Sequence, residues 1–314
     1  MDNFRQISKE TLASHPLLVP LGAFLLYLLL LLTLGGLLVK LIAAGTGFDL
    51  LSASEALIAG SSSESLAAWA FRGIQSVNQF AGYGLAAFLL AWMLGRPSEE
   101  LALRPASTPN FLFLAMLAMV ASLPLVQLLM LRPEYFTSLG LEGPFWERLI
   151  GQEGNAQVLL EAIFVGANKP SLLGNLLVFA ILPAICEEIF FRGLIQRQIA
   201  RHLNPHLAIW IAAAIFSFIH FQFLGFFSRW VLGAMLGYFL YYSGSLWPSI
   251  IAHFCFNAIS VVGASIYPEL AEPDYQFSWG PILISAVLTT VLMGLYVQQG
   301  RTRLQEAKSS QSNS

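Results

Sequence analysis

The sequence predicts an all-helical polytopic membrane protein, a bundle of about eight transmembrane helices. Of its 314 residues, 56% are hydrophobic and only 11% are charged, whereas soluble domains carry about 25% charged residues. The apolar residues gather in long runs, and about 20 such residues in a helix cross a hydrocarbon core of roughly 30 Å. The composition excludes an ordinary soluble domain, and no basic run indicates nucleic-acid binding.

Eight apolar runs are expected to cross the membrane. In chain order they are residues 17–44, 77–94, 111–131, 172–191, 207–221, 227–242, 246–266 and 281–297. The first run is longer than the core of a signal peptide, which has about 7–15 residues, so we expect it to be retained. Residues 66–74 and 158–165 are expected to form helices that lie at the membrane interface. Residues 192–206 are basic, and Pro205 is expected to stop the helix that precedes it.

The distribution of Lys and Arg predicts the orientation of these runs. With the N-terminus inside, the inner segments hold ten basic residues and the outer segments five. The inner ones are Arg5, Lys9, Arg96, Arg104, Arg192, Arg197, Arg201, Arg301, Arg303 and Lys308; the outer ones are Arg72, Arg132, Arg148, Lys169 and Arg229. We therefore expect a multi-pass protein of the cell membrane with both termini in the cytoplasm.

Along the chain we expect three regions. Residues 1–169 form an N-terminal membrane region with three spans and interfacial segments, 170–265 a core that carries the polar motifs, and 266–314 the last span and a cytoplasmic tail. The two cysteines, Cys186 and Cys255, lie in apolar runs, which argues against a disulfide framework or a four-thiolate metal site. The sequence does not indicate the oligomeric state.

Three short polar patterns lie in or at the end of three different apolar runs. They are Glu187-Glu188-x-x-x-Arg192, Phe216-x-x-x-His220 and His253-x-x-x-Asn257. Residues four apart share one face of a helix, and polar side chains inside a membrane mostly face the bundle interior. We therefore expect Glu188 to meet Arg192, and the acids, imidazoles and amide of three helices to converge in one pocket.

Such a group of side chains suits peptide hydrolysis. A carboxyl group in apolar surroundings can act as a base toward water and then as an acid toward the leaving amine. A neighbouring imidazole can share the water, and His and Asn side chains can donate hydrogen bonds to an oxyanion. Arg192 can hold Glu188 ionised while Glu187 exchanges protons, because adjacent carboxylates separate their pKa values.

Each pattern also has a structural interpretation when it is taken alone. A Glu–Arg pair at a helix end is often a simple ion pair, a single His often a packing residue, and Asn257 a hydrogen-bonding contact between helices. A non-catalytic membrane scaffold or partner-binding protein therefore stays open as an alternative. A small-solute transporter is a further alternative, but it usually shows paired repeats and broken helices, and the sequence indicates neither.

The ordered set EExxxR, FxxxH and HxxxN resembles the CAAX-prenyl-endopeptidase and bacteriocin-processing (CPBP, or Abi) family of intramembrane proteases. The resemblance covers roughly residues 170–265, with every motif position intact. It implies an endopeptidase that acts within the lipid bilayer on membrane-associated protein or peptide substrates. The prenylated substrates of the eukaryotic members are not carried over, because nothing in this chain indicates a prenyl pocket.

The resemblance also implies roles for six residues. It assigns activation of the water to Glu187 and His220, the oxyanion site to His253 and Asn257, and support of the site to Glu188 and Arg192. By the usual interpretation of the family the mechanism needs no cofactor.

Zinc stays open as an alternative, because two imidazoles and one carboxylate can hold a catalytic zinc ion. However, the chain contains no HExxH, and its two motif histidines lie on different runs. A Cys255 nucleophile is a weaker alternative, because Cys255 is two residues from both His253 and Asn257 and so points off their helix face.

The order of the runs sets a geometric condition on this site. At 1.5 Å per residue, counting from the loops places Glu187 nearer the cytoplasmic side and His220 nearer the outer side. The two meet only if the fifth run is displaced, tilted or short, or if residues 192–206 are partly embedded. The sequence does not decide among these conditions.

Overall fold

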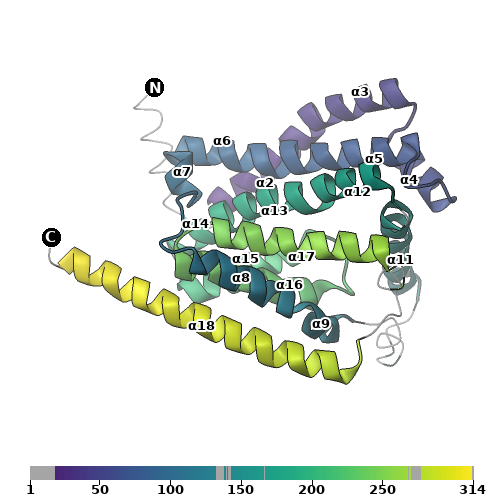
Figure 1. Ribbon diagram of the computed structural model, residues 1–314. Helices are drawn as coiled ribbons and strands as arrows, with labels where there is room; N and C mark the ends of the chain where they lie inside the picture. Colours follow the sequence, from purple (N-terminus) through teal and green to yellow (C-terminus); the bar gives the residue numbers. More distant parts are fainter. Residues whose placement is uncertain are drawn as a thin grey trace.

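The computed structural model describes residues 18–131, 138, 140, 143–165, 167–267, 269 and 277–312, and these residues form helices and no strands (Figure 1). The predicted all-helical, polytopic membrane fold is confirmed. The polar N-terminal segment with Arg5 and Lys9, and most of the acidic segment 267–278, lie outside the described residues.

The helices are labelled as in Figure 1, with η1, η2, η4 and η5 for π-helical and η3 for 3₁₀-helical segments. In chain order they are α2 (Leu18–Leu30), η1 (Leu31–Gly35), α3 (Gly36–Thr46), α4 (Leu50–Ile58), α5 (Leu66–Val77), η2 (Asn78–Gly84), α6 (Leu85–Leu94), α7 (Pro97–Glu100), α8 (Asn110–Ala121), α9 (Leu123–Val126), η3 (Gln127–Leu129), α11 (Pro144–Phe164), α12 (Lys169–Leu176), η4 (Leu177–Ile181), α13 (Leu182–Glu187), η5 (Glu188–Gln196), α14 (Arg197–Ala200), α15 (Pro205–Phe218), α16 (Phe226–Ser243), α17 (Trp247–Ile266) and α18 (Trp279–Ser312).

All eight predicted runs are helical, but fewer qualify as spans by length and composition. Within the described residues, five helices are long and apolar enough to cross a membrane, or six if a bent pair is one span. The five are Leu18–Thr46, Leu66–Leu94, Lys169–Ala200, Trp247–Ile266 and Trp279–Ala307. The predicted runs 207–221 and 227–242 are not among these spans. The first corresponds to α15, which has only 14 residues, or about 21 Å. The second corresponds to α16, which carries a series of buried side chains inside the bundle.

The bent pair corrects the expectation that the chain has no broken helix. The helices Asn110–Ala121 and Leu123–Leu129 meet at an angle of 46°. Pro124 follows the break directly, and a proline removes a backbone donor and clashes with the preceding turn. The signal for this bend was therefore present in the third apolar run.

Residues 66–94 form one helix, so the separate interfacial helix predicted for 66–74 is wrong. The Ser65 side chain caps its start by accepting a hydrogen bond from the Ala68 amide. Arg72 lies in the middle of this segment, where it is buried and its Nε donates to Asn175 Oδ1 at 2.8 Å. Arg72 therefore forms a buried contact between helices rather than a contact with the membrane interface.

Residues 169–200 likewise form one long helix, which continues past the predicted end of the span at residue 191 and through much of the basic segment 192–206. Arg192 is 1% exposed and bonds inside the bundle. The chain turns only after Ala200, and Asn204 then caps α15 by accepting a hydrogen bond from the His206 amide. The embedding of 192–200 was one of the conditions under which Glu187 and His220 could meet.

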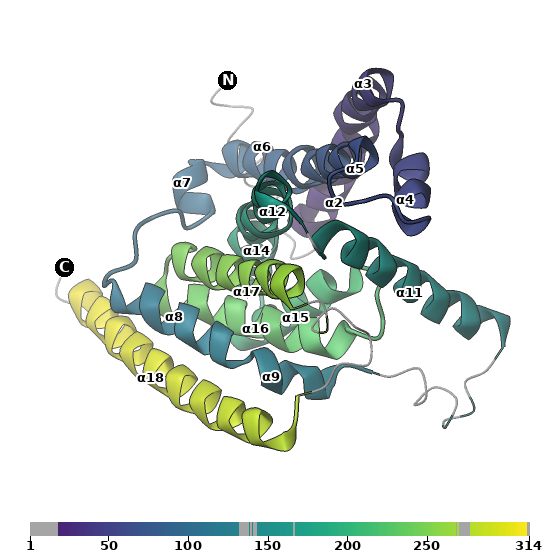
Figure 2. The same ribbon diagram turned by 45° about the vertical axis from the view of Figure 1, so that its right-hand side comes forward.

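The helix 66–94, the helix 169–200, α17, α8 and α18 lie side by side in that order. The helices α15 and α16 pack behind them (Figures 1 and 2). One apolar core lies between α2, α6, η5 and α15, and a second between α8, α16, α17 and α18. The helix α11 crosses one end of the bundle in both views. It contains residues 158–165 except the last, but it starts earlier than the predicted interfacial segment.

The other end of the bundle carries a group of arginines from segments far apart in the sequence. Arg197 donates to the backbone of α7, Arg201 bonds to Glu100, and Arg303 on α18 donates to the Tyr242 carbonyl. These residues are among those that the sequence assigns to the inner side. The structure contains no membrane, so the orientation itself stays a prediction.

Candidate active site

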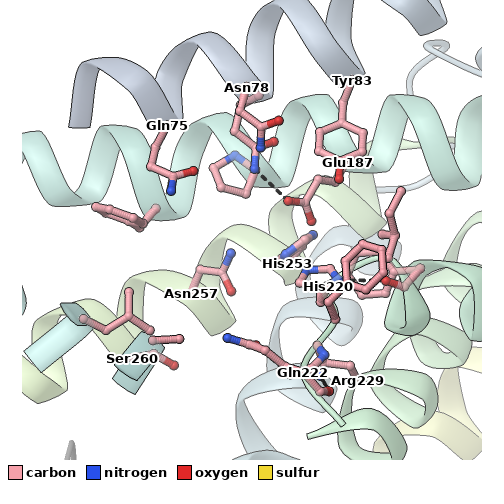
Figure 3. A pocket seen from close by; sticks show the side chains of 18 of the residues that line it. Gln75, Asn78, Tyr83, Glu187, His220, Gln222, Arg229, His253, Asn257 and Ser260 are labelled. Atoms are coloured by element: carbon pink, nitrogen blue, oxygen red, sulfur yellow. Dashed lines mark hydrogen bonds between the residues drawn. The ribbon is translucent and has the colours of Figure 1, made fainter. Parts of the chain in front are cut away.

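A cavity of about 960 Å³ lies between the helices, and the four predicted catalytic residues line it together (Figure 3). They are Glu187 on α13, His220 in the turn after α15, and His253 and Asn257 on α17. The predicted convergence in one pocket is therefore observed. The catalytic roles of these residues stay predictions.

The short helix α15 explains how Glu187 and His220 reach the same depth. Glu187 lies 13 residues before Ala200, and Phe218 lies 13 residues after Pro205, on the two sides of one connecting loop. At 1.5 Å per residue both positions are about 20 Å from that loop. His220 follows the end of α15 rather than lying within a span, which corrects the predicted helix 207–221.

Glu187 is held by an amide from a different helix. Its side chain is 6% exposed, and Oε1 accepts a hydrogen bond from Gln79 Nε2 at 2.8 Å. Gln79 lies in η2, which packs against α13. One carboxylate oxygen of Glu187 is thereby fixed, which leaves the other free to act toward the cavity.

Glu188 forms a fully buried network with two partners. Its Oε1 is 2.7 Å from Arg192 Nη1 and 2.9 Å from His253 Nδ1. Arg192 also donates from Nη2 to the Gly233 carbonyl at 3.2 Å, and its guanidinium lies 4.3 Å over the Phe216 ring. The predicted Glu188–Arg192 pair is present, and its connection to His253 joins the first motif to the third.

The hydrogen bond of His220 fixes which ring nitrogen can act on water. Nδ1 lies 2.7 Å from the Phe216 carbonyl oxygen. A carbonyl oxygen only accepts, so Nδ1 carries the proton, and Nε2 of the neutral ring carries a lone pair. The Phe216 ring packs at 4.9 Å from the imidazole, between centroids. The carbonyl and the ring of Phe216 thus hold the acceptor nitrogen of His220 in place.

His253 and Asn257 lie one turn apart on the same face of α17, and both point toward the cavity (Figure 3). Because Nδ1 of His253 faces Glu188, Nε2 is the ring atom left for a ligand. This nitrogen donates a hydrogen bond only when the ring is doubly protonated. The Asn257 amide can donate in either case.

The wall of the cavity that the helix 66–94 forms was not predicted from the sequence. The helix 66–94 presents Gln75, Asn78 and Tyr83 to it (Figure 3), and Gln79 also lines it. These residues stand at positions i, i+3, i+8 and i+4 of the helix. Amides at helical spacing inside an apolar run were the available signal. The opposite wall carries Arg229, which donates to Gln222 Oε1 at 3.1 Å.

The donor set does not fit a metal ion. Among the described residues, no three side chains of His, Cys, Asp or Glu come together as possible ligands. Within the network, Glu188 already accepts from Arg192 and His253. No step of the mechanism therefore uses zinc, and the absence of a cofactor stays a prediction.

Comparison with known proteins gives one family and one relative. Residues 169–259 match the family described as type II CAAX prenyl endopeptidase Rce1-like, which confirms the resemblance seen in the motifs. The chain is also 30% identical over 92 residues to the uncharacterized protein YpbD of Bacillus subtilis (strain 168). That match covers 27% of this chain and 43% of the relative. No solved structure matches.

Proposed function

We propose that this chain, whose residues 169–259 match the Rce1-like family of type II CAAX prenyl endopeptidases, is an intramembrane endopeptidase. The observation that supports this proposal most directly is the shared cavity. Glu187, His220, His253 and Asn257 reach it from three segments and line one space at one depth.

In the first step, Glu187 Oε2 and His220 Nε2 hold a water molecule against the substrate carbonyl. Glu187 takes one proton from the water, and the water oxygen bonds to the carbonyl carbon, so the carbonyl oxygen becomes an oxyanion. Asn257 Nδ2 and the doubly protonated His253 donate hydrogen bonds to that oxyanion.

In the second step, the protonated Glu187 passes its proton to the amide nitrogen. The oxyanion re-forms the carbonyl bond and the C–N bond breaks, which leaves a new carboxyl group and a free amine. Glu187 ends as a carboxylate, ready for the next water. Arg192 stays paired with Glu188 throughout.

We propose that the substrates are membrane-associated proteins or peptides and that the protein lies in the cell membrane with both termini in the cytoplasm. Apolar side chains of α2, η1 and α11, such as Leu28, Leu31, Leu159 and Leu160, also line the cavity. This lining suits a substrate that arrives from lipid. In the alternative, a non-catalytic scaffold, the same cavity would bind a partner without cleaving it.

The proposal is tested with protein purified in lipid nanodiscs and a panel of membrane-anchored and lipidated peptides, with products read by mass spectrometry. We expect the wild-type protein to cleave at least one peptide, and Glu187→Gln and His220→Ala to lose this cleavage. Glu161→Gln is the matched control, because Glu161 is exposed on α11 and does not line the cavity. Undiminished cleavage by Glu187→Gln, or none by the wild type, would overturn the proposal and favour the scaffold.

A further inference from the structure

Gln79 has an unusual environment for a buried amide. The side chain is 9% exposed, and its Nε2 donates to Glu187 Oε1 at 2.8 Å. Its Oε1 is buried and has no hydrogen-bond partner among the described residues. Leaving a buried acceptor unpaired is unfavourable, so the position of this oxygen requires an explanation. Gln79 lies on the helix 66–94, outside the residues that match the family.

A carboxamide can pair with either protonation state of a carboxyl group. An ionised carboxylate only accepts hydrogen bonds, whereas a protonated carboxyl group also donates one. The amide offers a donor in its NH₂ group and, beside it, an acceptor in its oxygen, so it can pair with both oxygens of a carboxyl group at once. The oxygen without a partner beside the carboxylate is thus the acceptor that a protonated Glu187 would need.

We infer that Gln79 is a positioning residue of the proposed peptidase that pairs with both forms of Glu187. Its Nε2 donates to the carboxylate before the reaction. While Glu187 carries the proton taken from water on Oε2, Gln79 Oε1 accepts from that O–H, and the O–H turns back toward the cavity when the proton leaves on the amine. This inference rests on the proposed function. Its consequence is that Glu187 keeps one orientation through both steps.

Several other ionisable groups lie near Glu187, but no hydrogen bond joins them to its carboxylate among the described residues. They are Tyr27 from α2, Tyr83 from η2, Cys186 from α13, Arg192 from η5 and His220 from the turn after α15. Tyr27 is bonded to Asn78, Arg192 to Glu188, and His220 to Phe216. In the part of the chain that the structure describes, Gln79 is the hydrogen-bond partner of the Glu187 carboxylate.

The test compares kcat, KM and the pH profile of kcat for the wild type, Gln79→Leu and Gln79→Glu. Loss of a hydrogen bond to a charged group predicts a fall in kcat of about 10- to 100-fold for Gln79→Leu, with KM nearly unchanged. The acidic limb of the profile should move to higher pH in both variants, because the carboxylate loses its donor and, in Gln79→Glu, gains an acidic neighbour.

Gln198→Leu is the matched control. Gln198 is a buried amide near the opposite end of the bundle, with one bond to Arg201 and an Nε2 that has no partner among the described residues. It should leave kcat and the pH profile as in the wild type. If Gln79→Leu does the same while the wild type cleaves, the inference is overturned and the proposed function stands.

An infrared titration of the Glu187 carboxyl group gives a readout that needs no turnover. The band of the protonated acid is assigned by its disappearance in Glu187→Gln. In Gln79→Leu this band should move to higher wavenumber, because the O–H loses its acceptor. An unmoved band contradicts the inference whether or not the protein cleaves peptides.

Discussion

Glu188 Oε1 lies 2.9 Å from His253 Nδ1, with both residues buried in the bundle. This contact joins η5 to α17, and the same oxygen also accepts from Arg192. One carboxylate therefore connects the buried guanidinium of Arg192 to a ring that faces the cavity. Glu187, the neighbouring acid, takes no part in this network and bonds to Gln79 instead.

The buried pair of Glu188 and Arg192 predicts a large and non-additive effect on stability. Glu188→Leu should lower the free energy of unfolding by about 3–5 kcal/mol, because it leaves the Arg192 guanidinium buried without its counter-charge. Adding Arg192→Leu should recover much of this loss, because the uncompensated charge is removed. Unfolding in mixed detergent micelles measures both values. A double variant that is less stable than Glu188→Leu by a further several kcal/mol would contradict this account of the pair.

Asn257 predicts a loss of turnover rather than of binding. Asn257→Leu removes a donor to the oxyanion, which elsewhere costs about 10²- to 10³-fold in kcat, while KM changes little. Cys255→Ala on the same helix should retain full activity. If Cys255→Ala abolished cleavage and Asn257→Leu did not, the thiol would be the nucleophile and the water mechanism would be wrong.

The arrangement of ligands predicts that metal chelators do not affect cleavage. Dialysis against EDTA or 1,10-phenanthroline should leave the initial rate unchanged, because no group of three metal-ligating side chains exists among the described residues. Adding zinc afterwards should not raise the rate. A loss of activity that zinc restores would show that the metal-dependent alternative is correct.

The packing of the first helix against the cavity wall predicts a steric effect at Gly82. A Cβ added there would lie 2.6 Å from the Tyr27 ring, so Gly82→Ala should destabilise the protein by about 1–3 kcal/mol. Gly22→Ala on α2 is the control, because nothing lies within 4 Å of its added Cβ. There, alanine should be neutral or stabilising by up to about 1 kcal/mol. Equal effects of the two changes would mean that α2 does not pack as the structure shows.

The sequence predicted the helices and the convergence of the motifs because both follow from local patterns. Apolar runs show which segments are helical, and residues four apart share a face, which brought Glu188 to Arg192. The histidines and Asn257 were expected in the cavity because lipid disfavours polar side chains. These inferences need no knowledge of how distant helices pack.

The features that the sequence did not predict depend on tertiary contacts. The length of α15 fixes the depth of His220, and an apolar run does not show where a helix ends within a bundle. The contacts of Gln79 and Arg72 were not predicted, because an isolated polar residue in a span is interpreted as an interface residue or an interhelical contact until its partner is known. Glu187 and Asn175 are those partners, on a helix far away in the sequence.

The central claim is that Glu187 and His220 act on the same water molecule, and a double-mutant cycle in kcat tests it most directly. The rates of the wild type, Glu187→Gln, His220→Ala and the double variant are measured on one peptide. Residues that act as a unit give non-additive losses, so we predict that the double variant is no slower than the slower single variant. Losses that multiply would show two independent roles and would contradict the account.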